Sequence, residues 1–227
     1  MVKVKICGIT NLTDARTAVK HGADFLGFNF YHKSPRYISP AAAARIVQKL
    51  PRRVRAVGVF VNENEGDVLR IARRVKLHQL QLHGDESPEI VERLQREFPV
   101  IKAIQVRGSA LSSRLNGFAK ADALLLDGFD GKQYDGTGKT FDWQVLRRAT
   151  LRQNVFLAGG LTAENVAEAI RVGDPYAVDV CGGVEARPGK KEPKRLAAFL
   201  HAAKSPLKSV AASNAKRRTK SKVRKKS

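Results

Sequence analysis

The strongest constraint on the fold is an eightfold alternation of short apolar runs with longer segments of helical periodicity. The expected strands are Val2–Cys7, Phe25–Phe30, Arg55–Val61, Leu77–Leu82, Val100–Val106, Ala123–Asp127, Val155–Ala158 and Ala177–Cys181. The expected helices are Thr13–His21, Pro40–Leu50, Gly66–Val75, Pro88–Phe98, Leu111–Phe118, Asp142–Ala149, Thr162–Val172 (with Thr162 as N-cap) and Glu192–Ala203. Strict alternation predicts a parallel sheet, because a helix then connects each strand to the next.

A closed barrel is the simplest arrangement of eight such units. Runs such as VGVFV (57–61) are apolar on both faces, which is typical of strands buried between a core and covering helices. The alternative is an open doubly wound sheet. That fold usually carries a Gly-rich fingerprint after its first strand, and the turn here reads CGITNL (7–12). The sequence therefore predicts an α/β protein, a single (βα)8 TIM barrel over residues 1–203.

The segment from Lys204 to Ser227 differs in composition from the rest of the chain, with ten Lys or Arg residues and no Asp or Glu. Because it cannot bury enough apolar surface to order itself, we expect a disordered basic tail over 204–227. Its charge predicts non-specific contact with polyanions, and the alternative is an extension without a binding role. A nucleic-acid-associated protein is the rival for the whole chain, whose net charge is +21, but the remaining charge is spread without an interleaved aromatic run.

The compartment follows from the cysteines and from the absence of long apolar runs in the sequence. Two cysteines, Cys7 and Cys181, imply no disulfide framework and fit a reducing compartment or a reactive thiol. The first residues, MVKVKICGIT, lack the apolar segment of a signal peptide. No apolar run approaches the ~20 residues that span a bilayer. We therefore expect a cytoplasmic protein without membrane contact.

In a barrel of this kind the active site is built where the strands end. Cys7, His83 and Asp127 end or follow the first, fourth and sixth expected strands. A thiol whose pKa is lowered by positive charge can act as a base, and a carboxyl at the end of an apolar strand can act as an acid. Together they would form a proton relay, with His83 as a substrate contact. The structural alternatives are a core cysteine, an N-capping aspartate and a simple turn histidine.

Strand alternation places Lys5 on the same face as Cys7, inside the barrel. A buried ammonium group needs an anionic partner, and Asp179 is the acid on the neighbouring eighth strand. We predict a Lys5–Asp179 ion pair; the alternative is a solvated Lys5 at the open end of the barrel. The same adjacency brings Cys7 and Cys181 into range for an inhibitory disulfide under oxidising conditions, which is a further hypothesis.

Glycine-rich loops follow the last three strands and indicate a phosphate site, because glycine lets backbone N–H groups approach phosphate oxygens. The candidate backbone donors are Gly136, Thr137, Gly138, Gly159, Gly160, Cys181, Gly182 and Gly183. Tight turns alone would explain the glycines of any single loop. Three consecutive loops of this kind favour a phosphate site.

The motifs that carry these residues, taken together, resemble the phosphoribosylanthranilate isomerase family. They are KICGIT (5–10), GFNFYHKSPRYI (27–38), VGVFVN (57–62), QLHGDE (81–86), LLLD (124–127), GTGKTFDW (136–143), AGGL (158–161) and AVDVCGGVE (177–185). The resemblance covers the chain from Val2 to about Ala203. It implies an Amadori rearrangement in tryptophan biosynthesis, with Cys7 as base, Asp127 as acid and Arg36 as partner of the anthranilate carboxylate. It implies no metal and no cofactor, and no histidine stands at ligand spacing from a cysteine or acid.

The chain departs from the family pattern at two places near the expected phosphate site. The family usually reads DVSSGVE where Cys181 and Gly182 stand here, so backbone donors survive but serine hydroxyls do not. The loop GFDGKQYDG (128–136) is also less typical. Other phosphosugar barrels are the rival enzymes: the next enzyme of the tryptophan pathway, or the histidine-pathway isomerase, which would carry a carboxylate in place of Cys7.

Overall fold

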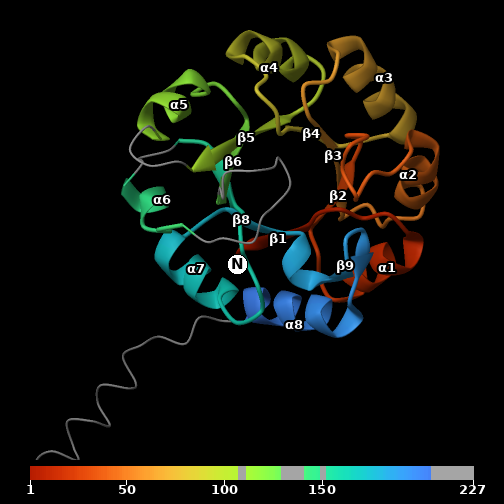
Figure 1. Ribbon diagram of the computed structural model, residues 1–227, viewed down its shortest axis with the longest axis vertical. Coiled ribbons are helices and arrows are strands. Elements are labelled where there is room, and N and C mark those ends of the chain that lie inside the picture. Colours follow the sequence, from red (N-terminus) through yellow and green to blue (C-terminus); the bar gives the residue numbers. More distant parts are fainter. Residues whose placement is uncertain (107–110, 129–140, 149–151, 206–227) are drawn as a thin grey trace, which may run out of the picture.

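The computed structural model describes residues 1–106, 111–128, 141–148 and 152–205, and within them eight parallel strands close into a barrel ringed by helices (Figure 1). The barrel strands, in order around the ring, are β1 (Lys3–Ile6), β2 (Phe25–Asn29), β3 (Arg55–Phe60), β4 (Gln79–Leu82), β5 (Val100–Val106), β6 (Ala123–Gly128), β7 (Asn154–Leu157) and β8 (Ala177–Val180). The helices are α1 (Leu12–Lys20), α2 (Pro40–Val47), α3 (Glu65–Val75), α4 (Pro88–Gln95), α5 (Leu111–Gly117), α6 (Val145–Arg148), α7 (Val166–Gly173) and α8 (Pro193–Lys204). The predicted (βα)8 barrel is confirmed.

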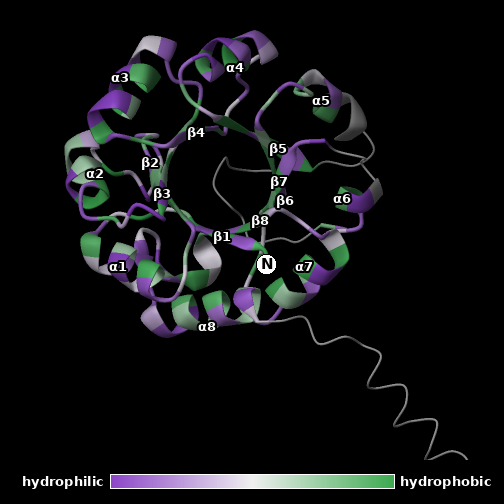
Figure 2. Ribbon diagram, turned by 180° about the vertical axis from the view of Figure 1, so that it is seen from behind, coloured by the Kyte–Doolittle hydropathy of each residue, from purple (hydrophilic) through white to green (hydrophobic). Residues whose placement is uncertain are grey.

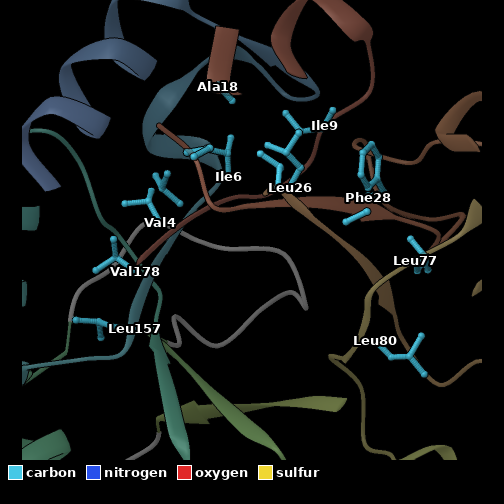
Figure 3. Packing of buried hydrophobic residues seen from close by; sticks show 14 of the residues in the cluster. Val4, Ile6, Ile9, Ala18, Leu26, Phe28, Leu77, Leu80, Leu157 and Val178 are labelled. Carbon is cyan, nitrogen blue, oxygen red and sulfur yellow. The ribbon is translucent and has the colours of Figure 1, made fainter. Parts of the chain in front are cut away.

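The larger apolar core lies between the strands and the helices. Figure 3 shows alternate residues of β1 and β2, such as Val4 and Leu26, directed into this layer. The helices contribute residues at helical spacing; in α3 these are Val68, Ile71, Ala72 and Val75. Figure 2 shows that each surrounding helix carries both polar and apolar residues, as an element with one buried face should.

The other set of alternate strand residues fills the barrel interior. A smaller apolar cluster there includes Phe25, Ile101, Leu125 and Phe156. On β1 and β8 the interior positions carry charged residues. These are Lys5 and Asp179, which are direct neighbours in the strand register. The barrel interior is therefore polar near the carboxyl ends of the strands, and the apolar cluster fills the part below.

The connection from β8 to α8 contains structure that the sequence pattern did not predict. A 3₁₀ turn, η2 (Gly182–Val184), is followed by an antiparallel hairpin of β9 (Glu185–Arg187) and β10 (Lys190–Lys191). Asp14 of α1 holds this hairpin, since its carboxylate accepts hydrogen bonds from the Lys191 amide and the Lys190 ammonium, both at 2.8 Å. The hairpin is thus fixed to α1.

Several predicted boundaries differ from those of the structure, and two of the differences have a clear local cause. α7 begins at Val166 with Asn165, not Thr162, at the N-cap position. Thr162 lies in a turn before the helix, where its hydroxyl accepts from the Glu164 amide at 3.3 Å and its own amide donates to the Asn165 side chain at 2.8 Å. Lys204 is the last residue of α8, with its ammonium 2.6 Å from the Asp24 carboxylate, and is not part of the tail. The remainder of the predicted tail, 206–227, lies outside the described residues. No helix in the described ranges is long and apolar enough to cross a membrane.

Candidate active site

A pocket opens at the carboxyl ends of the barrel strands, where the sequence predicts the site. It is lined by nine of the predicted site residues, namely Cys7, Arg36, His83, Asp127, Gly159, Gly160, Cys181, Gly182 and Gly183. The other three, Gly136, Thr137 and Gly138, lie outside the described residues. Residues that end or follow six different strands therefore meet in one cavity.

Cys7 directly follows β1, and its amide continues the strand ladder by donating to the Val180 carbonyl at 2.9 Å. Gly27 on β2 leaves room for the thiol, since a Cβ there would lie 2.9 Å from Cys7 Sγ. A hydrogen bond from Cys181 and the positive charges of Lys5 and Lys191 hold the pKa of Cys7 well below its usual value, although burial opposes this effect. Cys7 is therefore an activated thiol facing the pocket.

The predicted Lys5–Asp179 ion pair is confirmed, with Nζ and Oδ1 3.0 Å apart and both side chains buried. Burial alone would lower the pKa of Lys5, but Asp179 and the Cys7 thiolate raise it above its usual value. Burial raises the pKa of Asp179 to about 7, against the opposing charge of Lys5. Lys5 is thus a permanent positive charge beneath the thiol of Cys7.

A second buried cation, Lys191 of the hairpin, lies beside Cys181. Its ammonium lies 2.9 Å from Glu185 Oε1, 3.2 Å from the Cys181 carbonyl and 3.9 Å from Cys181 Sγ. The hydrogen bond to Cys7 and burial both raise the pKa of Cys181. Of the two neighbouring thiols, Cys7 therefore ionises first and Cys181 keeps its proton.

Asp127, on β6, enters the pocket beside His83. Its Oδ2 lies 3.5 Å from His83 Nε2, while His83 Nδ1 lies 2.8 Å from the Gln81 amide nitrogen. If Gln81 donates, the proton of a neutral His83 is on Nε2, an atom that has no hydrogen-bond partner among the described residues. Among the described residues Asp127 Oδ1 has no hydrogen-bond partner although it is buried. A buried, unsatisfied carboxyl oxygen is expected only where a ligand or water completes it.

One glycine in each of the loops after β7 and β8, Gly159 and Gly183, is required by close backbone approach. Gly159 has φ of +86°, and a Cβ there would lie 2.3 Å from the Gly128 amide nitrogen and 3.0 Å from Asp127 Oδ1. A Cβ on Gly183 would lie 2.1 Å from the Leu161 carbonyl oxygen. The two loops therefore pack directly on their neighbours and expose backbone at the rim of the pocket.

Arg36 lies in the loop after β2 and is mostly buried, so it is not a solvated surface charge. Its Nε and Nη2 donate to both carboxylate oxygens of Glu185, at 2.8–3.1 Å. Gly182 passes close by, since a Cβ there would lie 3.7 Å from Nη2. Glu185 thereby fixes the orientation of the guanidinium at the pocket wall.

The family model for N-(5'-phosphoribosyl)anthranilate isomerase matches residues 4–202. The enzyme of that name from Trichlorobacter lovleyi is 47% identical over 91% of this chain and 100% of its own length. The phosphoribosyl anthranilate isomerase structure from Thermotoga maritima has a TM-score of 0.85 at 46% identity, covering 90% of this chain and 99% of that one. The chain belongs to the phosphoribosylanthranilate isomerase family.

A further structure of a phosphoribosylanthranilate isomerase was solved in complex with reduced 1-(o-carboxyphenylamino)-1-deoxyribulose 5-phosphate. It has a TM-score of 0.81 at 44% identity and covers 90% of this chain and 99% of that one. Within the described residues, no group of three His, Cys, Asp or Glu side chains could hold a metal ion.

Two buried residues of this family member escaped the sequence analysis, Glu185 and Lys191. Glu185 stands inside a recognised motif but had no assigned role, and Lys191 belongs to a run of basic residues that is usually solvated. The only available signal was the position of Glu185 shortly after Cys181. Nothing in the local pattern indicates that the hairpin folds back over Cys7.

Proposed function

We propose that this chain catalyses the Amadori rearrangement of N-(5-phosphoribosyl)anthranilate to 1-(2-carboxyphenylamino)-1-deoxyribulose 5-phosphate, a step of tryptophan biosynthesis. Relatives bear the name of this isomerase, and a similar structure holds a reduced form of the product. The observation that carries the proposal is a single pocket lined by an activated thiol, Cys7, and a buried carboxyl, Asp127. The mechanism uses these side chains and no cofactor.

Asp127 protonates the ribose ring oxygen, the C1′–O bond breaks, and the ring opens to a protonated imine. The Cys7 thiolate then removes the proton from C2′. The electrons of that C–H bond form a carbon–carbon double bond, and the imine nitrogen becomes neutral. The resulting enolamine tautomerises to the ketone. Exchange with solvent returns a proton to Asp127 and removes one from Cys7, so the cycle closes.

The remaining pocket residues anchor the two ends of the substrate. Backbone N–H groups of the loops after β6, β7 and β8 bind the phosphate, an interaction that needs no serine hydroxyl and therefore tolerates Cys181 and Gly182. Arg36 binds the anthranilate carboxylate through the Nη1–Nη2 edge of its guanidinium, since its Nε–Nη2 edge faces Glu185. His83, beside Asp127, contacts the sugar or the aromatic ring.

The proposal is tested by adding phosphoribosylanthranilate to the purified protein and following the loss of anthranilate-type fluorescence. We expect a catalytic decrease with the full-length chain and a rate close to background with Asp127→Asn, because the amide cannot give a proton to the ring oxygen. No decrease with the full-length chain would refute the function. Wild-type turnover by Asp127→Asn would refute only the assignment of the acid.

We place this activity in the cytoplasm. We also propose that the basic segment after Ser205 contacts polyanions without sequence preference and takes no part in catalysis. Its composition supports this division, because its charge attracts phosphates while few of its residues could form a core.

A further inference from the structure

The pocket contains two thiols, and the proposed reaction uses only that of Cys7. Cys7 and Cys181 directly follow β1 and β8, which are adjacent parallel strands paired through Ile6 and Val180. Alternation then directs both thiols to the interior face, two residues beyond Lys5 and Asp179. Adjacent strands lie about 4.8 Å apart, which falls within the about 4.4–6.8 Å between Cα atoms that a disulfide requires.

Two observations place Cys181 Sγ beside the end of β1. The Cys7 amide donates to the Val180 carbonyl at 2.9 Å, so the two strands stay hydrogen-bonded up to these cysteines. A Cβ on Gly8, the residue after Cys7, would lie 3.0 Å from Cys181 Sγ, so that sulfur reaches across to the end of β1. Both cysteines are free, partly exposed, and line the pocket, which gives small molecules access to them.

The two thiols are chemically unequal. Cys7 is favoured as a thiolate by Cys181, Lys5 and Lys191, and a thiolate is the nucleophile in cysteine oxidation. Cys181 keeps its proton, and its Sγ lies 3.8 Å from Glu185 Oε1. This arrangement provides an attacking cysteine beside a resolving one.

We propose that Cys7 and Cys181 form a peroxide-reactive pair that closes reversibly into a disulfide. The Cys7 thiolate attacks a hydroperoxide; an S–O bond forms, the O–O bond breaks, and the leaving oxygen takes a proton, giving a sulfenic acid and water or an alcohol. Cys181 then attacks the sulfur of Cys7, the S–O bond breaks, and hydroxide leaves with the proton of Cys181 as water. The two sulfurs are oxidised and the peroxide is reduced.

Closure would consume the thiolate that the proposed isomerisation needs, so this consequence rests on the proposed function. The formation of the disulfide does not depend on that function. Reduction by a dithiol restores both thiols through exchange. The pair thus protects Cys7 from oxidation beyond the sulfenic acid, because Cys181 traps that acid as a disulfide.

The test treats the reduced full-length protein with hydrogen peroxide and maps its peptides by mass spectrometry without reduction. We expect a Cys7–Cys181 cross-linked peptide, loss of isomerase activity, and recovery of most activity with dithiothreitol. Cys181→Ser, which restores a residue usual in the family, and Cys181→Ala should instead accumulate sulfinic or sulfonic acid at Cys7 and recover little, each compared with its own untreated sample.

Two results would overturn the proposal. One is a wild-type protein in which Cys7 is overoxidised as fast as in Cys181→Ser; the other is a pair of thiols that both stay reduced while a control peptide with a free cysteine is oxidised. A cross-linked protein that keeps full activity would support the pair and refute Cys7 as the base. The mass measurement stands even if the chain shows no isomerase activity.

Discussion

Lys191, which lies after the last barrel strand, acts electrostatically on the Cys7 thiol, which lies after the first. Its ammonium is buried between Glu185 and Cys181, and its charge contributes to the low pKa of Cys7. It has no place in the reaction itself, so it is a positioning residue that acts through Cys7. Lys190, one residue earlier, instead pairs with Asp14 and is nearly half exposed.

Replacing Lys191 by Met should raise the pKa of Cys7, because a positive charge that favours the thiolate is lost. The acidic limb of the profile of kcat/KM against pH should move upward by about 1 pH unit, and the rate should recover at higher pH. Thiolate absorbance gives the same pKa directly. Lys190→Met is the matched control and should leave the limb in place; an unmoved limb in Lys191→Met would show that this charge does not act on Cys7.

Arg36→Met should act mainly on substrates that carry the anthranilate carboxylate. The substrate analogue without the carboxylate should be turned over almost equally by the two proteins, whereas the natural substrate should lose kcat/KM in the variant. If removing the carboxylate costs the variant as much as the wild type, Arg36 is not its partner.

Sequence reasoning succeeded for residues whose position follows from strand geometry. Lys5 and Asp179 are predictable as a pair because alternation gives the face of each, and closure of the barrel makes their strands neighbours. Glu185 and Lys191 are not predictable in this way, because a hairpin whose residues are mostly charged has no apolar period to mark its buried face.

At the level of elements, the β9–β10 hairpin depends on α1. Asp14 is buried, and its carboxylate accepts hydrogen bonds from the Lys191 backbone amide, the Lys190 ammonium and the Asn11 side-chain amide. Burial alone would raise the pKa of Asp14, but these donors lower it below its usual value. The error at α7 also comes from a contact outside the expected pattern. The Thr162 amide donates to the Asn165 side chain in a turn before the helix, and Asn165 takes the N-cap position.

Asp14→Ala should lower the free energy of unfolding by about 1–3 kcal/mol, because the buried Lys191 amide loses its acceptor. Since the pKa of Asp14 is lowered in the fold, its contribution is complete above about pH 4 and is lost as the pH falls below that value. Urea unfolding of variant and wild type should therefore converge in acid. Glu168→Ala, which removes an exposed pair with Arg171, should cost clearly less, because solvent screens an exposed pair. Equal costs would contradict the role of Asp14.

At the scale of the whole molecule, we predict that the barrel and the basic segment are separable. The composition predicts this division, but only the structure shows that Lys204 belongs to the barrel, where it pairs with Asp24 and donates to the Val2 carbonyl at 3.2 Å. A one-residue shift of this kind depends on a tertiary contact that no local pattern records.

A chain ending at Ser205 should keep the kcat/KM of the full-length protein, while its retention on a heparin column should fall and depend less on salt. A chain ending at Ala203 is the matched comparison and should be less stable, because it loses the Lys204 contacts. A large loss of activity on ending at Ser205 would mean that the segment contributes to the site.

The most direct test of the account is the turnover of phosphoribosylanthranilate by Cys7→Ser. The serine hydroxyl is nearly isosteric but is a far weaker base near neutral pH. We predict a kcat lower by ~10²–10⁴-fold with a much smaller change in KM, because the base acts in the transition state and not in binding. A variant that keeps a third or more of the wild-type activity would contradict the assignment of Cys7 as the base.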